Sequence, residues 1–98
     1  DLNNAVKDLN TVRQRAGIGD YAGALTQAAV ERELLNERGR ELFFENKRWF
    51  DLVRFHKGGT INVYNYVPNL AGKNTPLFWP LNSTVLANNP KIEQTSGY

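Results

Sequence analysis

The chain contains no cysteine and no methionine, and it has one histidine, His56. Without cysteine it can form neither a disulfide nor a thiolate metal site, and a metal ion or a catalytic triad would need partners that a lone histidine lacks. No apolar run approaches the roughly 18 residues that a membrane-spanning helix requires. No signal peptide is recognisable. These absences exclude cysteine chemistry, and we expect no bound cofactor or metal.

What the sequence does have is an ordinary globular composition, with 41% hydrophobic and 22% charged residues. Its 98 residues suffice for at most one small domain, which by itself would be of modest stability. The formal net charge is only +2, and the lysines and arginines are interleaved with glutamates instead of forming a basic stripe. A nucleic-acid partner is therefore not expected.

Three helices are predicted in the first part of the chain. Apolar residues recur at three- and four-residue steps over residues 2–16, and Gly17 follows as a helix stop. A second helix is expected from an N-cap at Thr26 to about Asn46. A third, shorter helix is expected over residues 47–56, where a pair of glycines follows.

The character of the sequence changes after residue 57. Prolines and asparagines become frequent, which argues for irregular structure. Alternating apolar residues over 61–67 give a weak strand signal, and residues 83–88 suffice for one helical turn. The predicted fold class is therefore mainly α, with a helical core at residues 1–57 and a Pro/Asn-rich segment wrapping over it at residues 58–98.

The most distinctive stretch is residues 37–54, ERGRELFFENKRWFDLVR, in which charges alternate with apolar anchors. These anchors are Leu42, Phe44, Trp49, Phe50 and Leu52. On an ideal helix Glu41 and Glu45 share a broad stripe with Leu34, and charges in such a stripe are costly to bury unless they are paired. Gly39 is expected to admit another backbone or an aromatic ring. The stretch predicts a partly buried ion-pair network that ties helices together, made of Glu37, Arg38, Glu41, Glu45, Arg48, Asp51 and Arg54.

The same region offers two candidates for catalysis. Glu41 and Glu45 share a helix face, as the paired carboxylates of a glycosidase might. Hydrolases, however, bring their two carboxylates from facing elements across a cleft, and here Arg38 and Arg48 are near enough to neutralise the pair. His56 follows a helix end, where a cation is favoured. We therefore favour structural roles for these residues and do not expect an enzyme.

Aromatic side chains are candidates for ligand binding, because their faces pack against the apolar faces of sugars. The candidates are Trp49, Tyr64, Tyr66, Phe78, Trp79 and Tyr98. Trp49 is expected on the inner face of the third helix, and residues 78–80 are expected to clamp over the helices. Tyr64 and Tyr66 lie in a polar loop and are the weak candidates for a glycan-binding surface.

Three motifs occur in order along the chain. Residues 9–17 read LNTVRQRAG, residues 37–54 contain Glu-Arg, Glu-Leu, Phe-Glu, Arg-Trp and Asp-Leu pairs with a closing arginine, and residues 89–98 read NPKIEQTSGY. Together they resemble the SusD/RagB family of glycan-binding outer-membrane lipoproteins. Two departures are Asn46, where the family usually has glycine, and Asn82, in place of the second proline of a Pro-Ile-Pro segment.

The resemblance implies that residues 1–98 are a C-terminal fragment of a longer, TPR-containing lipoprotein on the extracellular face of a Bacteroidetes-type outer membrane, anchored through an N-terminal cysteine outside these residues. Such proteins capture oligosaccharides and deliver them to a SusC-like TonB-dependent transporter by binding alone. The implied partners are the transporter, an oligosaccharide and the remainder of the parent chain. A family member that binds peptides or other nutrients, and a helical protein-interaction module, remain alternatives.

Overall fold

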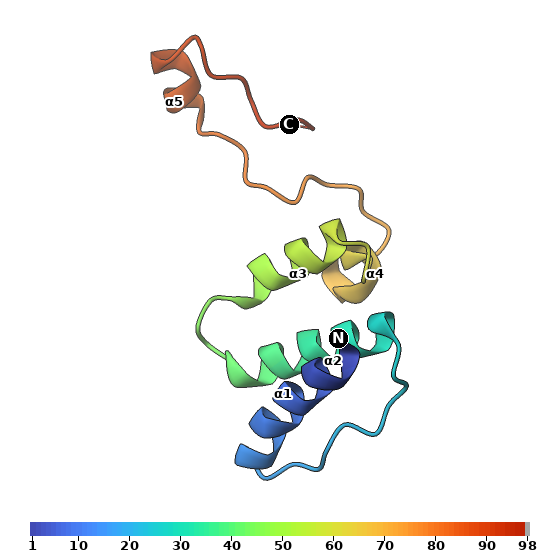
Figure 1. Ribbon diagram of the computed structural model, residues 1–98. Coiled ribbons are helices and arrows are strands. Elements are labelled where there is room, and N and C mark those ends of the chain that lie inside the picture. The colour runs from blue at the N-terminus through green and yellow to red at the C-terminus, as the bar shows by residue number, and fades with distance from the viewer. Residues whose placement is uncertain (98) are drawn as a thin grey trace. The chain divides into compact units, whose positions relative to one another are not determined.

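The computed structural model describes residues 1–97, and helices dominate it (Figure 1). In chain order the elements are α1 (Leu2–Arg15), α2 (Gln27–Glu41), α3 (Arg48–Lys57), α4 (Val63–Tyr66), the 3-10 turn η1 (Pro68–Leu70) and α5 (Ser83–Asn88). Residues 1–97 contain no strand, so the predicted mainly-α class is confirmed. The chain divides into two compact units, Asp1–Val63 and Tyr64–Tyr98. The aromatic candidate Tyr98 lies outside the described residues.

The first helix is confirmed at both ends. Asp1 caps α1 by accepting a hydrogen bond at Oδ1 from the main-chain N–H of Asn3, at 3.0 Å. At the other end Gly17 has a φ of +74°, and its N–H donates to the carbonyl of Gln14 at 3.0 Å. Glycine takes this left-handed conformation without a steric penalty, so it ends the helix where the sequence predicts.

The second helix begins where predicted but ends early. Thr26 accepts a hydrogen bond at Oγ1 from the first turn of α2, at 3.3 Å. The helix stops at Glu41, whereas the sequence predicts an end near Asn46. Phe44 and Asn46 have φ angles of +65° and +57°. Left-handed residues cannot continue a right-handed helix, so the chain turns between Glu41 and α3.

The third helix is confirmed, and it completes the core of the first unit. Trp49 is half-buried on α3, as expected of the inner face. The buried apolar residues are Leu9, Val30, Leu35, Leu52, Val53, Ile61 and Val63. Because α2 contacts both α1 and α3, this core extends over two sides of one helix (Figure 1).

The central position of α2 explains why the burial of some of its apolar residues differs from the prediction. A helix covered on two sides buries more of its circumference than a single stripe. Leu35 is therefore completely buried, while Leu34, predicted for the inner stripe, is 42% exposed. The expected anchors Phe44 and Phe50 are also wrong, since both rings are exposed. Phe44 belongs to the turn and not to a helix, so the helical stripe does not apply to it.

The predicted strand at residues 61–67 is wrong. Residues Val63–Tyr66 form the single helical turn α4, and Val63 is completely buried. Its main-chain N–H donates to Nδ1 of His56 at 3.4 Å. A strand needs a neighbour to satisfy its main-chain groups, and the described chain offers none.

In the second unit, the predicted helical turn at residues 83–88 is confirmed as α5. Asn82 caps it by accepting a hydrogen bond at Oδ1 from the N–H of Thr84, at 2.8 Å. The tail is held by Gln94, whose side-chain amide bonds to both main-chain groups of Leu81. Oε1 accepts from the Leu81 N–H at 2.8 Å, and Nε2 donates to its carbonyl at 3.2 Å. The amide thus substitutes for a partner strand.

The clamp over the helices that is expected of residues 78–80 stays a prediction. The Trp79 side chain is 84% exposed and Phe78 is 53% exposed in the structure. The segment runs between Pro76 and Pro80 without a helix of its own. Its main chain is nevertheless held within the unit, because Thr95 donates from Oγ1 to the carbonyl of Trp79 at 3.1 Å.

Candidate functional site

One charged cluster joins α1 to α2 around Glu37, which is only 4% exposed. Arg13 of α1 donates from Nη1 to Glu33 at 2.7 Å and to Glu37 at 3.3 Å. Arg40 of α2 donates from Nη2 to the same two carboxylates, at 2.7 Å and 2.6 Å. Two arginines therefore neutralise two glutamates that would repel each other at their i, i+4 spacing.

The pKa shifts in this cluster follow from its contacts. Burial raises the pKa of Glu33, but hydrogen bonds from Arg40 and Asn36 and the charges of Arg40 and Arg13 outweigh it, so the pKa lies below its ordinary value. Hydrogen bonds to Glu37 and Glu33 raise the pKa of Arg40. The ionised forms of Glu33 and Arg40 are thus favoured by their contacts, and the cluster is suited to holding α1 and α2 together.

A second charged cluster joins α2 to α3 around Asp51, which is also 4% exposed. Arg38 of α2 binds it through two hydrogen bonds, from Nε to Oδ2 at 2.9 Å and from Nη2 to Oδ1 at 3.0 Å. Arg54 of α3 donates from Nη2 to Oδ1 at 2.8 Å. Without these arginines Asp51 would be an uncompensated buried charge.

The remaining members of the predicted network lie elsewhere. Glu41 pairs with Arg15 of α1, and this ion pair is exposed. Glu45 is exposed and takes part in none of the ion pairs found among residues 1–97. Arg48 donates from Nη1 to the main-chain carbonyl of Leu35 at 2.6 Å. Because α2 ends at Glu41, Glu45 is not on the helical face that the sequence suggests.

Gly39 admits an arginine, where the sequence suggests a backbone or an aromatic ring. A Cβ added to Gly39 would lie 2.6 Å from Nη1 of Arg48. The same nitrogen donates to the Leu35 carbonyl, so the guanidinium of Arg48 lies directly against α2. The missing side chain of Gly39 thus makes room for a polar contact between α3 and α2.

Two of the three candidates for catalysis, Glu41 and His56, have structural partners. Glu41 is bound to Arg15, and Glu45 lies in the turn after α2, so the two carboxylates do not face each other across a cleft. Nδ1 of His56 accepts the hydrogen bond from Val63. Among residues 1–97, no group of three His, Cys, Asp or Glu side chains is placed to hold a metal ion. No helix in this range is both long and apolar enough to cross a membrane.

The two weak glycan-binding candidates are half-buried. The hydroxyl of Tyr64 donates to the carbonyl of Thr75 at 2.5 Å, and Tyr66 ends α4. A sugar platform requires an accessible ring face, and the rings of Phe43 and Phe44 are much more exposed.

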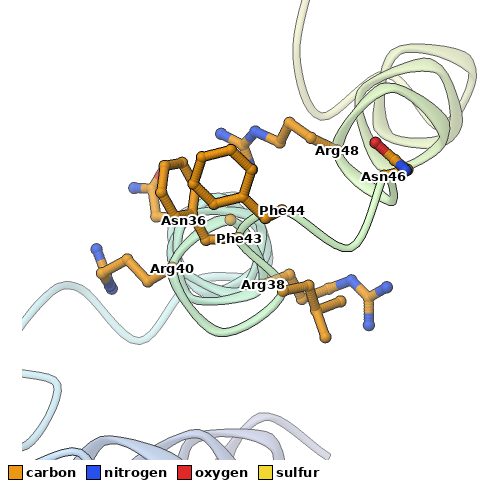
Figure 2. Close-up of a pocket in the computed structure, with 9 residues that line it drawn as sticks. Asn36, Arg38, Arg40, Phe43, Phe44, Asn46 and Arg48 are labelled. Atoms are coloured by element: carbon orange, nitrogen blue, oxygen red, sulfur yellow. The ribbon is translucent and has the colours of Figure 1, made fainter.

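Those two exposed rings border an open pocket of about 480 Å³ at the end of α2. The pocket is lined by Asn36, Arg38, Gly39, Arg40, Leu42, Phe43, Phe44, Asn46 and Arg48. Figure 2 shows the two phenylalanine rings next to each other in this lining, and their centroids are 4.4 Å apart. Three arginines and no acidic residue line the pocket, so it is suited to apolar groups that carry hydrogen-bond acceptors.

Sequence reasoning missed several partners in these clusters. Arg13, Arg15, Glu33 and Arg40 each form at least one ion pair. The available signal was the spacing of Glu33, Glu37 and Glu41, which lie four residues apart on α2 and need basic partners beside them. The two arginines in the last turn of α1 also favour the helix end on their own account, so the local sequence does not indicate that they reach α2.

The sequence of this chain is similar to sequences of known proteins. The model of the SusD family matches residues 1–98. A SusD-like protein of Formosa agariphila is 38% identical over 81 residues, which cover 83% of this chain and 15% of that protein. The chain therefore spans about 15% of the length of the curated relative that it matches. No solved structure matches the chain.

Proposed function

This chain belongs to the SusD family, and on that premise we propose that it is the architectural C-terminal part of a cell-surface protein that captures oligosaccharides. The observation that carries this proposal is the family match over residues 1–98. The captured sugar is delivered to a SusC-like TonB-dependent transporter. The process is binding followed by transfer to the transporter, and no covalent bond of the sugar changes.

The architectural role rests on the two buried charged clusters. Glu37 and Asp51 hold α2 to its two neighbours through arginines that are already engaged. We therefore propose that the main sugar site lies in the parent chain outside residues 1–98. Tyr64 and Tyr66 remain the weak candidates for a sugar contact within this chain.

The proposed location follows from the same family membership. The parent protein is anchored by a lipid on an N-terminal cysteine and faces the outside of the cell at the outer membrane. Its partners are the transporter, the oligosaccharide and the rest of its own chain. Copurification of the full-length parent with a TonB-dependent transporter from solubilised outer membranes tests the partnership, and its absence from that membrane fraction would contradict the location.

The binding proposal is tested by calorimetric titration of the full-length parent with a panel of neutral and acidic oligosaccharides and a matched panel of peptides. We expect saturable binding of an oligosaccharide that is recovered unchanged. Preferential binding of peptides would show that the nutrient is a peptide and not a sugar. Cleavage of the sugar would contradict the proposal that the protein acts by binding alone.

The architectural role has its own control in the same titration. Tyr64→Ala and Tyr66→Ala variants should bind the sugar as the unmodified parent does. Loss of affinity in either variant, with an unchanged melting temperature, would place a sugar contact in this chain.

A further inference from the structure

The turn between α2 and α3 exposes two neighbouring aromatic rings. Phe43 is 71% exposed and Phe44 is 87% exposed. Their centroids are 4.4 Å apart with the ring planes tilted by 59°, so the two rings form one continuous apolar surface. Contiguous apolar surface of this kind marks an interaction site far more often than isolated exposed apolar residues do.

The main chain of the turn is also strained. Phe44 has a φ of +65°, in a region that bulky residues rarely adopt, and Asn46 follows with a φ of +57°. Conformations of this kind persist where the surroundings over-determine them. The ring of Phe44 reaches Phe43, but at 87% exposure it receives little packing from the described chain. Contacts from outside these residues would account for the conformation.

The charges around the rings indicate what kind of group can cover them. Arg38, Arg40 and Arg48 line the pocket beside the rings, and no acidic side chain does (Figure 2). A symmetric contact between two copies would bring together two pockets that both lack an acidic lining residue, so it offers no complementary charge. A group with apolar side chains and hydrogen-bond acceptors fits better, whether the acceptors are carboxylates or the free carbonyls at a helix C-terminus.

We propose that the surface formed by Phe43 and Phe44 is the docking site for a segment of the parent chain outside residues 1–98. The matched relative has most of its length outside the region that resembles this chain, so such a protein contains ample chain to supply the segment. The segment places apolar side chains on the two rings and acceptor groups toward the arginines. This inference rests on the proposed function, because it requires that residues 1–98 are part of a longer parent chain, but it does not depend on which nutrient that protein binds.

Hydroxyl-radical footprinting of the full-length parent tests the proposal directly. Oxidation of Phe43 and Phe44 is measured by mass spectrometry in the native protein and in urea. We expect both rings to be strongly protected in the native parent at every protein concentration. Reaction rates close to those of the unfolded chain would overturn the proposal. Protection that disappears on dilution would assign the surface to a second copy, and protection that requires lipid vesicles or added oligosaccharide would assign it to those partners.

A pair of variants in the same parent provides an independent readout. Phe44→Ala removes the ring but keeps a Cβ, so the left-handed main chain is not relieved. Glu45→Ala is the matched control, because Glu45 is exposed in the same turn and forms no ion pair among residues 1–97. We expect the melting temperature to fall by several degrees for Phe44→Ala only. Equal melting temperatures would overturn the proposal, and the footprint of the unmodified parent decides the question if Phe44→Ala does not fold.

Discussion

At the scale of single residues, burial separates carboxylates that look alike in the sequence. Asp51 is 4% exposed and receives three hydrogen bonds from two arginines. Glu41 is exposed, and its partner Arg15 lies in water as well. Buried charges lose hydration and depend on their partners, whereas exposed pairs are screened by solvent. The two residues should therefore respond differently to the same substitution.

We predict that Asp51→Ala lowers the free energy of unfolding by about 3 kcal/mol, because it leaves the Arg38 guanidinium without its buried partner. Glu41→Ala should cost much less, because it removes an exposed pair that solvent screens. Urea unfolding of both variants measures the difference. Equal losses would show that burial does not decide the strength of these ion pairs.

A second residue-scale prediction concerns Gly39. Alanine in a helix is favoured over glycine by about 1 kcal/mol, but a Cβ here would displace the Arg48 guanidinium from Leu35. We therefore expect Gly39→Ala to give no net stabilisation in the unmodified protein. In an Arg48→Ala background the same change should stabilise by about 1 kcal/mol. A double-mutant cycle measures this, and additive effects would disprove the coupling.

At the scale of elements, the turn after α2 explains a departure from the family pattern. The resemblance noted in the sequence implies a glycine where this chain has Asn46, and the structure gives this residue a φ of +57°. Glycine and asparagine are the residues that tolerate this region best. Asn46 therefore keeps the turn between α2 and α3 possible, even though the glycine is missing.

We predict that Asn46→Ala destabilises the protein by about 1 kcal/mol, because alanine has a Cβ and no side chain that bonds locally. Asn46→Gly should be close to neutral. Lys47 provides the control at the next position, since its φ is −89°. At position 47, glycine should therefore destabilise the protein more than alanine does. Thermal unfolding of the four variants, alanine and glycine at each position, measures their stabilities. The same order of alanine and glycine at both positions would contradict the prediction.

The tail of the second unit provides another element-scale prediction. Gln94→Leu removes both side-chain hydrogen bonds to Leu81. Each such bond contributes about 1 kcal/mol, so amide exchange at Leu81 should accelerate by about tenfold or more. Hydrogen-exchange NMR measures this rate. Glu93→Ala, at an exposed neighbour, should leave it unchanged, and an unaltered rate in Gln94→Leu would show that the tail is held by other contacts.

At the scale of the whole molecule, charged clusters hold the three long helices of the first unit together. Arg13 links α1 to Glu33 and Glu37, and Arg38 links α2 to Asp51. Helices joined through ionised carboxylates depend on pH, because protonation removes one partner of each pair. Acid should therefore weaken the first unit through its helix contacts.

We predict that the stability of the protein falls as the pH drops below the ordinary glutamate value of about 4.3. The pKa of Glu33 is lower in the folded protein than its ordinary value, so its pairs stabilise fully above that value and are lost as the pH falls through the folded pKa. Unfolding midpoints measured between neutral and acidic pH should decline less steeply for Glu33→Gln. Glu45→Gln is the control, and identical profiles for both variants would disprove the role of Glu33.

Local sequence patterns predict much of this fold. Asp1, Gly17, Thr26 and Asn82 mark helix ends through interactions within one turn, and three of these four are hydrogen-bonded side-chain caps. The early end of α2 was not predictable in the same way, because the φ of Phe44 contradicts its own preference. Some charged residues of the two clusters, such as Glu37, Arg38 and Asp51, could be identified from the sequence, but their pairing depends on how α1 and α3 lie against α2.

The sequence by itself determined the helical class, the stop at Gly17, the N-cap at Thr26 and the family, because these depend on neighbouring residues and on ordered motifs. Only the tertiary structure decided that Leu35 and not Leu34 is buried, that Arg13 neutralises Glu37, and that Glu45 stays in solvent. The physical reason is that burial and ion pairing depend on surfaces brought together from distant parts of the chain, and no local periodicity encodes which sides of α2 are covered.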